Sequence, residues 1–345
     1  MKELEQLVRK NILNMKPRTE NKPSAKTEAH IFLDANENPY NEPYNRYPDP
    51  MQAKLKNKLS HIKRVYPDCI FLGNSSDEAV DLIYRCFAEP RQDNVVAIEP
   101  TRSLYHTYAE INDVEYRSVM LSADFQLSAD SILYRCDANT KVVWLCSPND
   151  PTGNELQREA IMAVIELFDG IVVVDEAYAD FSKSPSLRQE LHNLPNVIIL
   201  DSFSHAWGCA SLGTSMAFAH PEIIDLLNKV KYTHNISTEI QHKIYDQLSK
   251  MYEADKWRNI LLMERDRLMD AFRLLPCCEK VYPTDANFFL ARMTDADAIY
   301  SYLRERGILV KNVSREELCD GCLRITVGSK TENSELLSIL RQINI

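Results

Sequence analysis

Short aliphatic runs alternate with helix-like segments from about residue 69 to about residue 220. The runs are rich in β-branched residues, as buried strands are, and five of them stand out: 70–72, 94–98, 142–145, 171–174 and 197–200. Strands that alternate with helices predict a mainly parallel sheet with helices on both faces. Ligands of such sheets bind beyond the carboxyl ends of the strands. The pattern therefore predicts an α/β fold and the edge at which a site should lie.

The length of 345 residues allows a large core and more than one domain. We expect a large domain over residues 45–235, which includes a helix near 51–61, and a small C-terminal domain over 236–345. From residue 277 the small domain reads as strand, strand, helix, strand, helix. Residues 1–44 are expected to form an N-terminal arm that contributes to the small domain, with a short strand at the apolar residues 31–33.

The formal net charge of −10 at pH 7 is opposite in sign to the basic face that nucleic-acid binding needs. No stretch approaches the roughly 18 apolar residues of a membrane-spanning helix. The first residues are charged and lack the apolar centre of a secretion signal. We therefore expect a cytoplasmic protein that binds neither nucleic acid nor membranes.

Nine cysteines in a chain without a secretion signal predict free thiols. Cys319 and Cys322 have the spacing of a metal knuckle or a redox pair, and the adjacent Cys277 and Cys278 could complete a four-thiolate zinc site. Both pairs flank apolar strand-like runs, and free cysteine is often buried. The interpretation as buried core residues is therefore favoured, and no metal is expected.

Three polar motifs follow directly after strands of the predicted sheet. They read Ser-Pro-Asn-Asp-Pro-Thr-Gly at 147–153, Val-Val-Val-Asp-Glu-Ala-Tyr at 172–178 and Ser-Phe-Ser-His-Ala-Trp-Gly at 202–208. Because parallel strands end at one edge, the motifs should converge on one site. Asp175 ends a buried strand, where a carboxylate either caps a following helix or faces a ligand. The residues alone leave both interpretations open.

Together the motifs resemble the cofactor pocket of pyridoxal-phosphate aminotransferases of fold type I, and the likeness to the histidinol-phosphate aminotransferase family covers nearly the whole chain. The resemblance implies a large, mostly parallel α/β/α sandwich domain and a small α+β domain. It also implies the cofactor pyridoxal 5'-phosphate, a homodimer, and small-molecule amino and keto substrates. In that family the reaction is amino transfer between histidinol phosphate and 2-oxoglutarate or glutamate, in histidine biosynthesis.

Several cofactor contacts of that family are retained here. By resemblance, Asp175 holds the ring nitrogen protonated and Tyr178 donates to the phenolic oxygen. Ser202 and Ser204 match hydroxyl donors of the site. The loop 73–79, Gly-Asn-Ser-Ser-Asp-Glu-Ala, precedes a helix whose N-terminus would hold the cofactor phosphate, and it contributes the candidate residues Ser75, Ser76 and Asp77.

Three further positions match the family outside the three motifs. Tyr47 matches a tyrosine that reaches the cofactor phosphate across a dimer interface. Arg324 matches the arginine that binds the anionic group of the substrate, and Asn36 is assigned to the same substrate end. Without the resemblance, an arginine in a C-terminal strand such as Arg324 would be interpreted as a surface charge.

Five departures from the family pattern fall on this one site. Ser75 replaces a glycine, which should limit a positive φ. Arg102 replaces the aromatic residue that stacks on the cofactor ring, and Gly213 replaces the arginine that binds the phosphate. Asp150 replaces an asparagine, so a group that only accepts hydrogen bonds would face the phenolate with like charge. His205 replaces the lysine that forms the Schiff base.

His205 cannot form that imine, so we expect lysine-dependent transamination to be lost or greatly reduced and the cofactor to bind weakly and non-covalently. Two alternatives stay open. His205 could act as a base on non-covalent pyridoxamine phosphate, because histidine titrates near neutral pH. The chain could instead be a non-catalytic binding or partner subunit. Lys229 and Lys231, which could in principle replace the missing lysine, are expected at the surface.

Overall fold

The structure, a computed structural model, describes residues 3–16 and 31–343. Its large sheet consists of β1 (Ile70–Asn74), β2 (Asn94–Glu99), β3 (Glu115–Met120), β4 (Thr140–Cys146), β5 (Ile171–Asp175), β6 (Val197–Ser202) and β7 (Thr214–Ala219). Their spatial order is β1-β7-β6-β5-β4-β2-β3. Neighbours among β2 to β6 pair in parallel, whereas β7 runs antiparallel to β1 and β6. The predicted mainly parallel sheet is confirmed.

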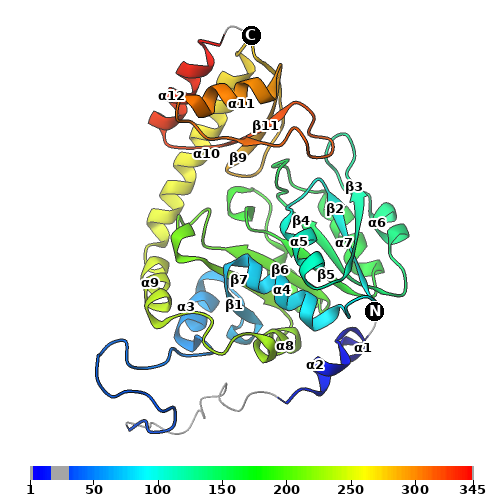
Figure 1. Ribbon diagram of the computed structural model, residues 1–345, viewed down its shortest axis with the longest axis vertical. Coiled ribbons are helices and arrows are strands. Elements are labelled where there is room, and N and C mark those ends of the chain that lie inside the picture. Colours follow the sequence, from blue (N-terminus) through cyan, green and yellow to red (C-terminus); the bar gives the residue numbers. More distant parts are fainter. Residues whose placement is uncertain (1–2, 17–30, 344–345) are drawn as a thin grey trace.

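Helices cover both faces of this sheet (Figure 1). One face packs against α3 (Ala53–Lys63), α6 (Ala129–Arg135), α7 (Arg158–Leu167) and α9 (Thr238–Leu248), and the other against α4 (Ser75–Phe87), α5 (Leu104–Ile111) and α8 (Pro221–Val230). Alternate strand residues point to opposite faces. In β5, Val172 and Val174 belong to one apolar cluster and Ile171 and Val173 to the other. Burial on both faces accounts for the uninterrupted aliphatic runs.

A second, antiparallel sheet with the order β10-β11-β9-β8 lies apart from the first, at the top of Figure 1. It contains β8 (Cys278–Val281), β9 (Phe288–Met293), β10 (Lys311–Asn312) and β11 (Cys322–Thr326). The long helix α10 (Met251–Arg273) leads to it, and α11 (Ala296–Glu305) and α12 (Lys330–Leu340) pack on it around a separate apolar cluster. The two-residue β10 is the one element that the sequence prediction lacks after residue 277.

The N-terminal segment differs from its prediction in two ways. Helices α1 (Leu4–Leu7) and α2 (Lys10–Asn14) place Leu7 and Ile12 in a cluster of the large sheet, not against the small one. Residues 31–33 form no strand, and the side chain of Leu33 is 91% exposed. The prediction of a strand there was wrong because an apolar run needs a partner strand to pair with. The boundaries at residues 44 and 235 stay predictions.

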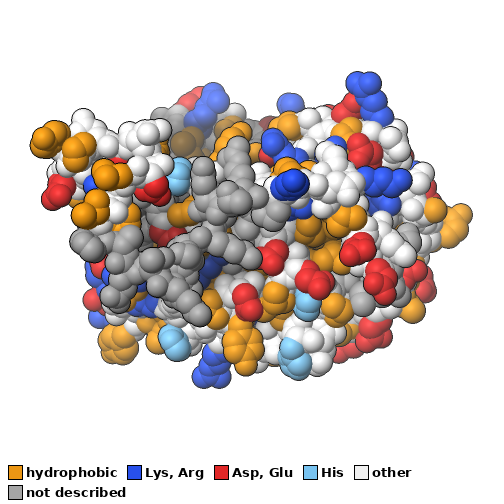
Figure 2. Space-filling view, turned by 90° about the horizontal axis from the view of Figure 1, so that it is seen from below, with side chains coloured by type: hydrophobic (Ala, Val, Ile, Leu, Met, Phe, Trp, Pro, Cys, Tyr) orange, Lys and Arg blue, Asp and Glu red, His pale blue; other side chains and the backbone are white. Residues whose placement is uncertain are grey.

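Short 3₁₀ helices complete the described chain: Pro67–Cys69, Ala179–Phe181, Leu187–Asn193 and Ala210–Leu212. None of the helices in the described residues is long and apolar enough to cross a membrane. Figure 2 shows acidic and basic side chains interspersed on the face seen from below.

The nine cysteines are free thiols, as predicted. Cys319 and Cys322 are buried, and burial raises the pKa of both thiols, to about 12 for Cys319. A raised pKa leaves little of the reactive thiolate at neutral pH. Within residues 3–16 and 31–343, no three His, Cys, Asp or Glu side chains are grouped so that they could hold a metal ion.

Candidate active site

The carboxylate of Asp175 lies at the carboxyl end of β5 and is 1% exposed. Its Oδ2 accepts hydrogen bonds from Arg102 Nη1 at 2.5 Å and from the Tyr105 hydroxyl at 2.7 Å. Its Oδ1 accepts from the Ala177 backbone N–H at 3.0 Å. Both carboxylate oxygens are therefore engaged by groups of the chain itself, and a guanidinium neutralises the charge.

Arg102 lies in the loop before α5 and Tyr105 in its first turn, three residues apart, so both side chains reach Asp175. The Tyr105 ring is fully buried and stacks on Trp144 of β4, with ring centres 4.9 Å apart. Burial opposes the charge on Arg102, but the Asp175 carboxylate outweighs it and keeps the pKa of the guanidinium well above its usual value. The sequence analysis missed the hydrogen bond from Tyr105 to Asp175; the one-turn spacing of Tyr105 from Arg102 was the available signal.

A second carboxylate, Asp150, follows β4 in the turn 147–153. Its Oδ2 accepts a hydrogen bond from the Tyr178 hydroxyl at 3.2 Å. Its Oδ1 forms an ion pair with Nη1 of Arg324, which lies on β11 of the small sheet. The adjacent Asn149 is buried, and its amide nitrogen donates to Pro100 O and Thr152 Oγ1. Asn149 is thus committed to the turn and cannot replace the amide missing at position 150.

His205 lies in the loop between β6 and β7 and stacks on Tyr178, with ring centres 4.4 Å apart. Burial lowers the pKa of the imidazole, and the positive charge of Arg102 lowers it further. The carboxylates of Asp175 and Asp150 act in the opposite direction but do not outweigh these effects. The neutral form of His205 is therefore favoured. Tyr178 stacks on His205 and donates to Asp150, so it joins the histidine to the second carboxylate.

The loop before α4 holds the residues expected to bind a phosphate. Ser76 Oγ accepts a hydrogen bond from Arg102 Nη2 at 3.4 Å, and the Asp77 N–H donates to Ser75 Oγ at 3.3 Å. Ser202 Oγ accepts from the Ser204 N–H at 3.0 Å. Several polar groups at this end of the site are thus bonded to each other.

Ser75 was expected to limit a positive φ, but its φ is 69°. The prediction was wrong because contacts on both sides hold the residue in place. Its N–H donates to Gly213 O at 2.5 Å, and its carbonyl oxygen accepts from Ser215 Oγ at 2.6 Å. Gly213 itself has a φ of 54°, a conformation that an arginine at this position would adopt only with strain.

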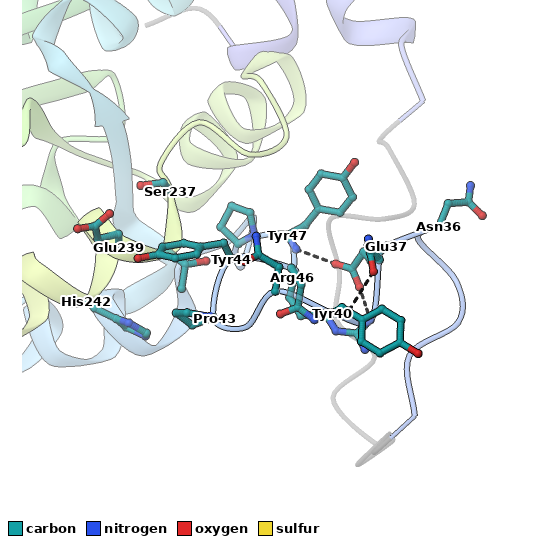
Figure 3. Close-up of a pocket in the computed structure, with 15 residues that line it drawn as sticks. Asn36, Glu37, Tyr40, Pro43, Tyr44, Arg46, Tyr47, Ser237, Glu239 and His242 are labelled. Carbon is teal, nitrogen blue, oxygen red and sulfur yellow. Dashed lines mark hydrogen bonds and ion pairs between the residues drawn. The ribbon is translucent and has the colours of Figure 1, made fainter.

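Tyr47 and Asn36 lie in a different place, in the arm. They help to line a cavity of about 730 Å³ between the arm and the start of α9, and its lining residues include neither Asp175 nor any of the residues that bond to it. Figure 3 shows the Glu37 carboxylate directed at Arg46 and at the backbone of Tyr47, whereas Asn36 points away from them. The structure brings together the large-sheet residues and Arg324, but not Tyr47 or Asn36.

The two candidate replacement lysines are engaged elsewhere. Lys229 Nζ donates to the carbonyl oxygens of Ile12 and Leu13. Lys231 is 4% exposed, and its ammonium donates to Pro50 O and Asn235 Oδ1. The expectation of a surface position was therefore wrong for Lys231, whose long apolar stem packs inside while backbone and amide oxygens satisfy its head.

The sheet order, with one antiparallel strand among parallel ones, and the carboxylate at the end of β5 are those of fold type I, the fold of pyridoxal-phosphate-dependent transferases. Residues 20–340 match the family described as aminotransferase class I and II. The chain belongs to that family and, within it, to the histidinol-phosphate aminotransferases.

Curated relatives named histidinol-phosphate aminotransferase match over the full length. The protein of Bacteroides fragilis is 52% identical over 99% of each chain, and that of Parabacteroides distasonis is 46% identical over 100% of each. Among solved structures, the histidinol-phosphate aminotransferase of Clostridium acetobutylicum has a TM-score of 0.79 at 19% identity and covers 86% of this chain and 90% of its own. The Sinorhizobium meliloti enzyme, solved with pyridoxal-5'-phosphate, has a TM-score of 0.79 at 20% identity, with 86% and 82% covered.

Proposed function

We propose that this chain is a histidinol-phosphate aminotransferase homologue in which lysine-dependent transamination is lost. The observation that carries the proposal is His205 at the tether position, beside an Asp175 carboxylate already neutralised by Arg102. The relatives' names supply the ancestral reaction, amino transfer to or from histidinol phosphate. The side chains of the pocket supply the reason for its loss.

The residues present do not fit a lysine-bound pyridoxal phosphate. A pyridinium nitrogen needs the Asp175 carboxylate, and that carboxylate has three donors of its own. Gly213 offers no side chain to a phosphate, and Asp150 offers only acceptor oxygens to a phenolate. Binding of pyridoxal phosphate is therefore proposed to be non-covalent and weak.

One observation favours a second candidate function. The lowered pKa of His205 leaves the imidazole neutral, which is the form in which it can accept a proton. A repurposed enzyme could use it as a base with non-covalent pyridoxamine phosphate. This candidate ranks second, because Arg102 occupies Asp175 and Gly213 cannot hold a phosphate with a charge.

We also propose a cytoplasmic homodimer. Several apolar side chains of the arm are exposed, including Phe32 at 51%, Leu33 at 91% and Tyr44 at 74%. A contiguous exposed apolar segment is commonly covered by a partner, and a second copy is the symmetric choice. Light scattering at micromolar concentration should give the dimer mass; a monomer mass would contradict this proposal. A non-catalytic subunit paired with an active relative remains the alternative assembly.

The proposed function is tested by a transamination assay with histidinol phosphate and 2-oxoglutarate in the presence of added pyridoxal phosphate. The Bacteroides fragilis relative serves as the positive control. We expect no turnover above the protein-free background. After borohydride reduction, mass spectrometry should find no cofactor fixed to the chain at a single lysine. Turnover comparable with the control, or one stoichiometric lysine adduct, would show that the proposal is wrong.

A further inference from the structure

A recess of about 260 Å³ lies on the face of the large sheet that α7 covers. Buried aliphatic side chains contribute much of its lining: Leu156, Ile161, Val174 and Leu187. Val174 belongs to the apolar cluster of this face, whereas Tyr105, a hydrogen-bond partner of Asp175, belongs to the cluster of the opposite face. The recess is therefore separate from the pocket around Asp175, and neither Asp175 nor Asp150 lines it.

Two carboxyl groups, those of Glu155 and Glu176, line the same recess. Glu155 accepts hydrogen bonds from the hydroxyls of Ser182 and Ser184. Glu176 is buried and accepts from the Ser186 hydroxyl and from one backbone N–H. All of these donors are neutral. Within the described part of the chain, neither carboxyl group therefore has a cation at ion-pair distance.

The cations nearest to these carboxyl groups are engaged with other carboxylates. Arg158 is the one cationic side chain that lines the recess, and its Nη2 pairs with Glu190 at 2.5 Å. Arg188 acts on Glu176 from outside the recess, and Asp201 acts on it with the opposite sign. These two also face each other, with 3.5 Å between Arg188 Nη1 and Asp201 Oδ2. The recess is thus apolar on one side and lacks a free positive charge on the other.

We propose that this recess binds a small organic cation, a protonated amine with a short aliphatic chain, at Glu155 and Glu176. An ammonium group carries three donors and supplies the counter-charge that both carboxyl groups lack. The aliphatic chain packs against the buried side chains of the recess and leaves water. The inference goes beyond the proposed function and does not depend on it, because the recess and the pocket around Asp175 lie on opposite faces of the sheet.

The pH dependence of binding separates this role from a purely structural one. Burial raises the pKa of Glu176 to about 7, so much of its carboxyl group is protonated at neutral pH. An ammonium binds the ionised form, and an alkylamine stays protonated up to about pH 10. The affinity should therefore rise, by up to about tenfold, between about pH 6 and about pH 8 as Glu176 ionises.

The test is a titration of the full chain, labelled at its methyl groups, with isoamylamine, followed by NMR at constant ionic strength. We expect saturable shifts of the methyl signals of Leu156, Ile161 and Val174. The dissociation constant should lie in the millimolar range, because so small a ligand supplies little binding energy. Isoamyl alcohol and isovalerate have the same carbon skeleton without the positive charge, and they should bind at least about tenfold more weakly.

Glu176→Gln should weaken binding of isoamylamine by about tenfold at pH 8 and abolish the pH dependence, and Glu155→Gln should weaken binding but keep that dependence. Glu159→Gln is the matched control, since Glu159 is an exposed residue in the first turn of α7 that does not line the recess. If Glu176→Gln does not fold, the pH dependence of the unaltered protein still decides. No saturable shifts at these methyl groups, equal affinity for isoamyl alcohol, a flat pH profile, or an equal loss in Glu159→Gln would overturn the proposal.

Discussion

The two arginine–carboxylate pairs of the pocket differ in how completely they are satisfied. Asp175 is 1% exposed, receives three hydrogen bonds and is paired with Arg102 from the same side of the molecule, the large sheet and its helices. The Asp150 side chain is 12% exposed and is paired with Arg324 from the small sheet, whose Nε has no hydrogen-bond partner in the described part of the chain.

This difference assigns the two pairs different roles. A buried ion pair costs desolvation and is stable only when the remaining donors and acceptors are also satisfied. The Asp175 pair meets that condition. The Asp150 pair does not, because the buried Nε of Arg324 has no partner within the described residues. We therefore expect stability to depend more on the first pair than on the second.

Arg102→Leu should have the largest effect on stability. It leaves the Asp175 carboxylate buried without a counter-charge, and breaking a buried pair costs about 3–5 kcal/mol. We expect a loss of about 3 kcal/mol in the free energy of unfolding, measured by urea titration at pH 7. Arg91→Leu is the control, because the Arg91–Asp113 pair is exposed and its loss should be undetectable. A loss for Arg102→Leu no larger than for this control would remove the distinction between the two pairs.

Glu176 follows Asp175 in the chain, and its carboxyl group accepts hydrogen bonds from two neutral donors, Ser186 Oγ and the Leu187 N–H. The variant Glu176→Gln tests whether this group is protonated in the folded state. Burial raises the pKa of Glu176 to about 7. The folded state therefore retains a proton that the unfolded state releases near pH 4.5, and this group lowers stability as pH rises from about 4.5 to 7. Glu176→Gln should reduce that fall by on the order of 1–2 kcal/mol in urea titrations across this range. An unchanged pH profile would show that Glu176 is ionised in the folded protein.

Asp150→Asn should change stability less than Arg102→Leu, by about 1–2 kcal/mol, because the asparagine keeps an oxygen that can accept a hydrogen bond from Arg324, whereas leucine leaves Asp175 without a counter-charge. The same urea titration measures it. A loss as large as that of Arg102→Leu would mean that the Asp150–Arg324 pair contributes as much to the free energy of unfolding as the Asp175–Arg102 pair. The distinction between the two pairs would then be wrong.

Ser75→Gly should give the smallest change, a gain of under about 1 kcal/mol. Glycine adopts a φ of 69° without the strain that serine bears, although the Ser75 Oγ contact with the Asp77 N–H is lost. Ser76→Gly is the control: it lies in α4 without a positive φ and should be destabilised by about 0.5–1 kcal/mol. Thermal melts of both variants show whether the positive φ of Ser75, in the loop before α4, costs stability.

The fold was predictable because its signal is local. The aliphatic runs at 142–145 and 171–174 showed buried parallel strands, and the position of Asp175 at a strand end followed directly. The prediction of a strand at 31–33 was wrong because strand formation depends on a partner strand that no local pattern reveals. The prediction that Ser75 would not adopt a positive φ was wrong for a similar reason, since contacts with Gly213 and Ser215 hold it there.

The pairing inside the site was not predictable from the sequence. Arg102 and Asp175 are separated by 73 positions and Asp150 and Arg324 by 174, so each substitution was visible alone but its partner was not. From the sequence, Arg102 was interpreted only as the loss of an aromatic residue. The structure shows that its guanidinium pairs with the Asp175 carboxylate. Comparison with the family located the altered positions; the three-dimensional contacts show that two of them, Arg102 and Asp150, pair with the retained Asp175 and Arg324.

The most direct test of the account asks whether Arg102, and not merely the missing lysine, excludes the cofactor. Equilibrium dialysis with pyridoxal phosphate would compare the unaltered protein, His205→Lys and the double variant His205→Lys/Arg102→Tyr. The account predicts little retained cofactor in the first two, and in the double variant retention on the order of tenfold higher together with a visible absorbance band. Tight retention by the unaltered protein, or by His205→Lys alone, would contradict it.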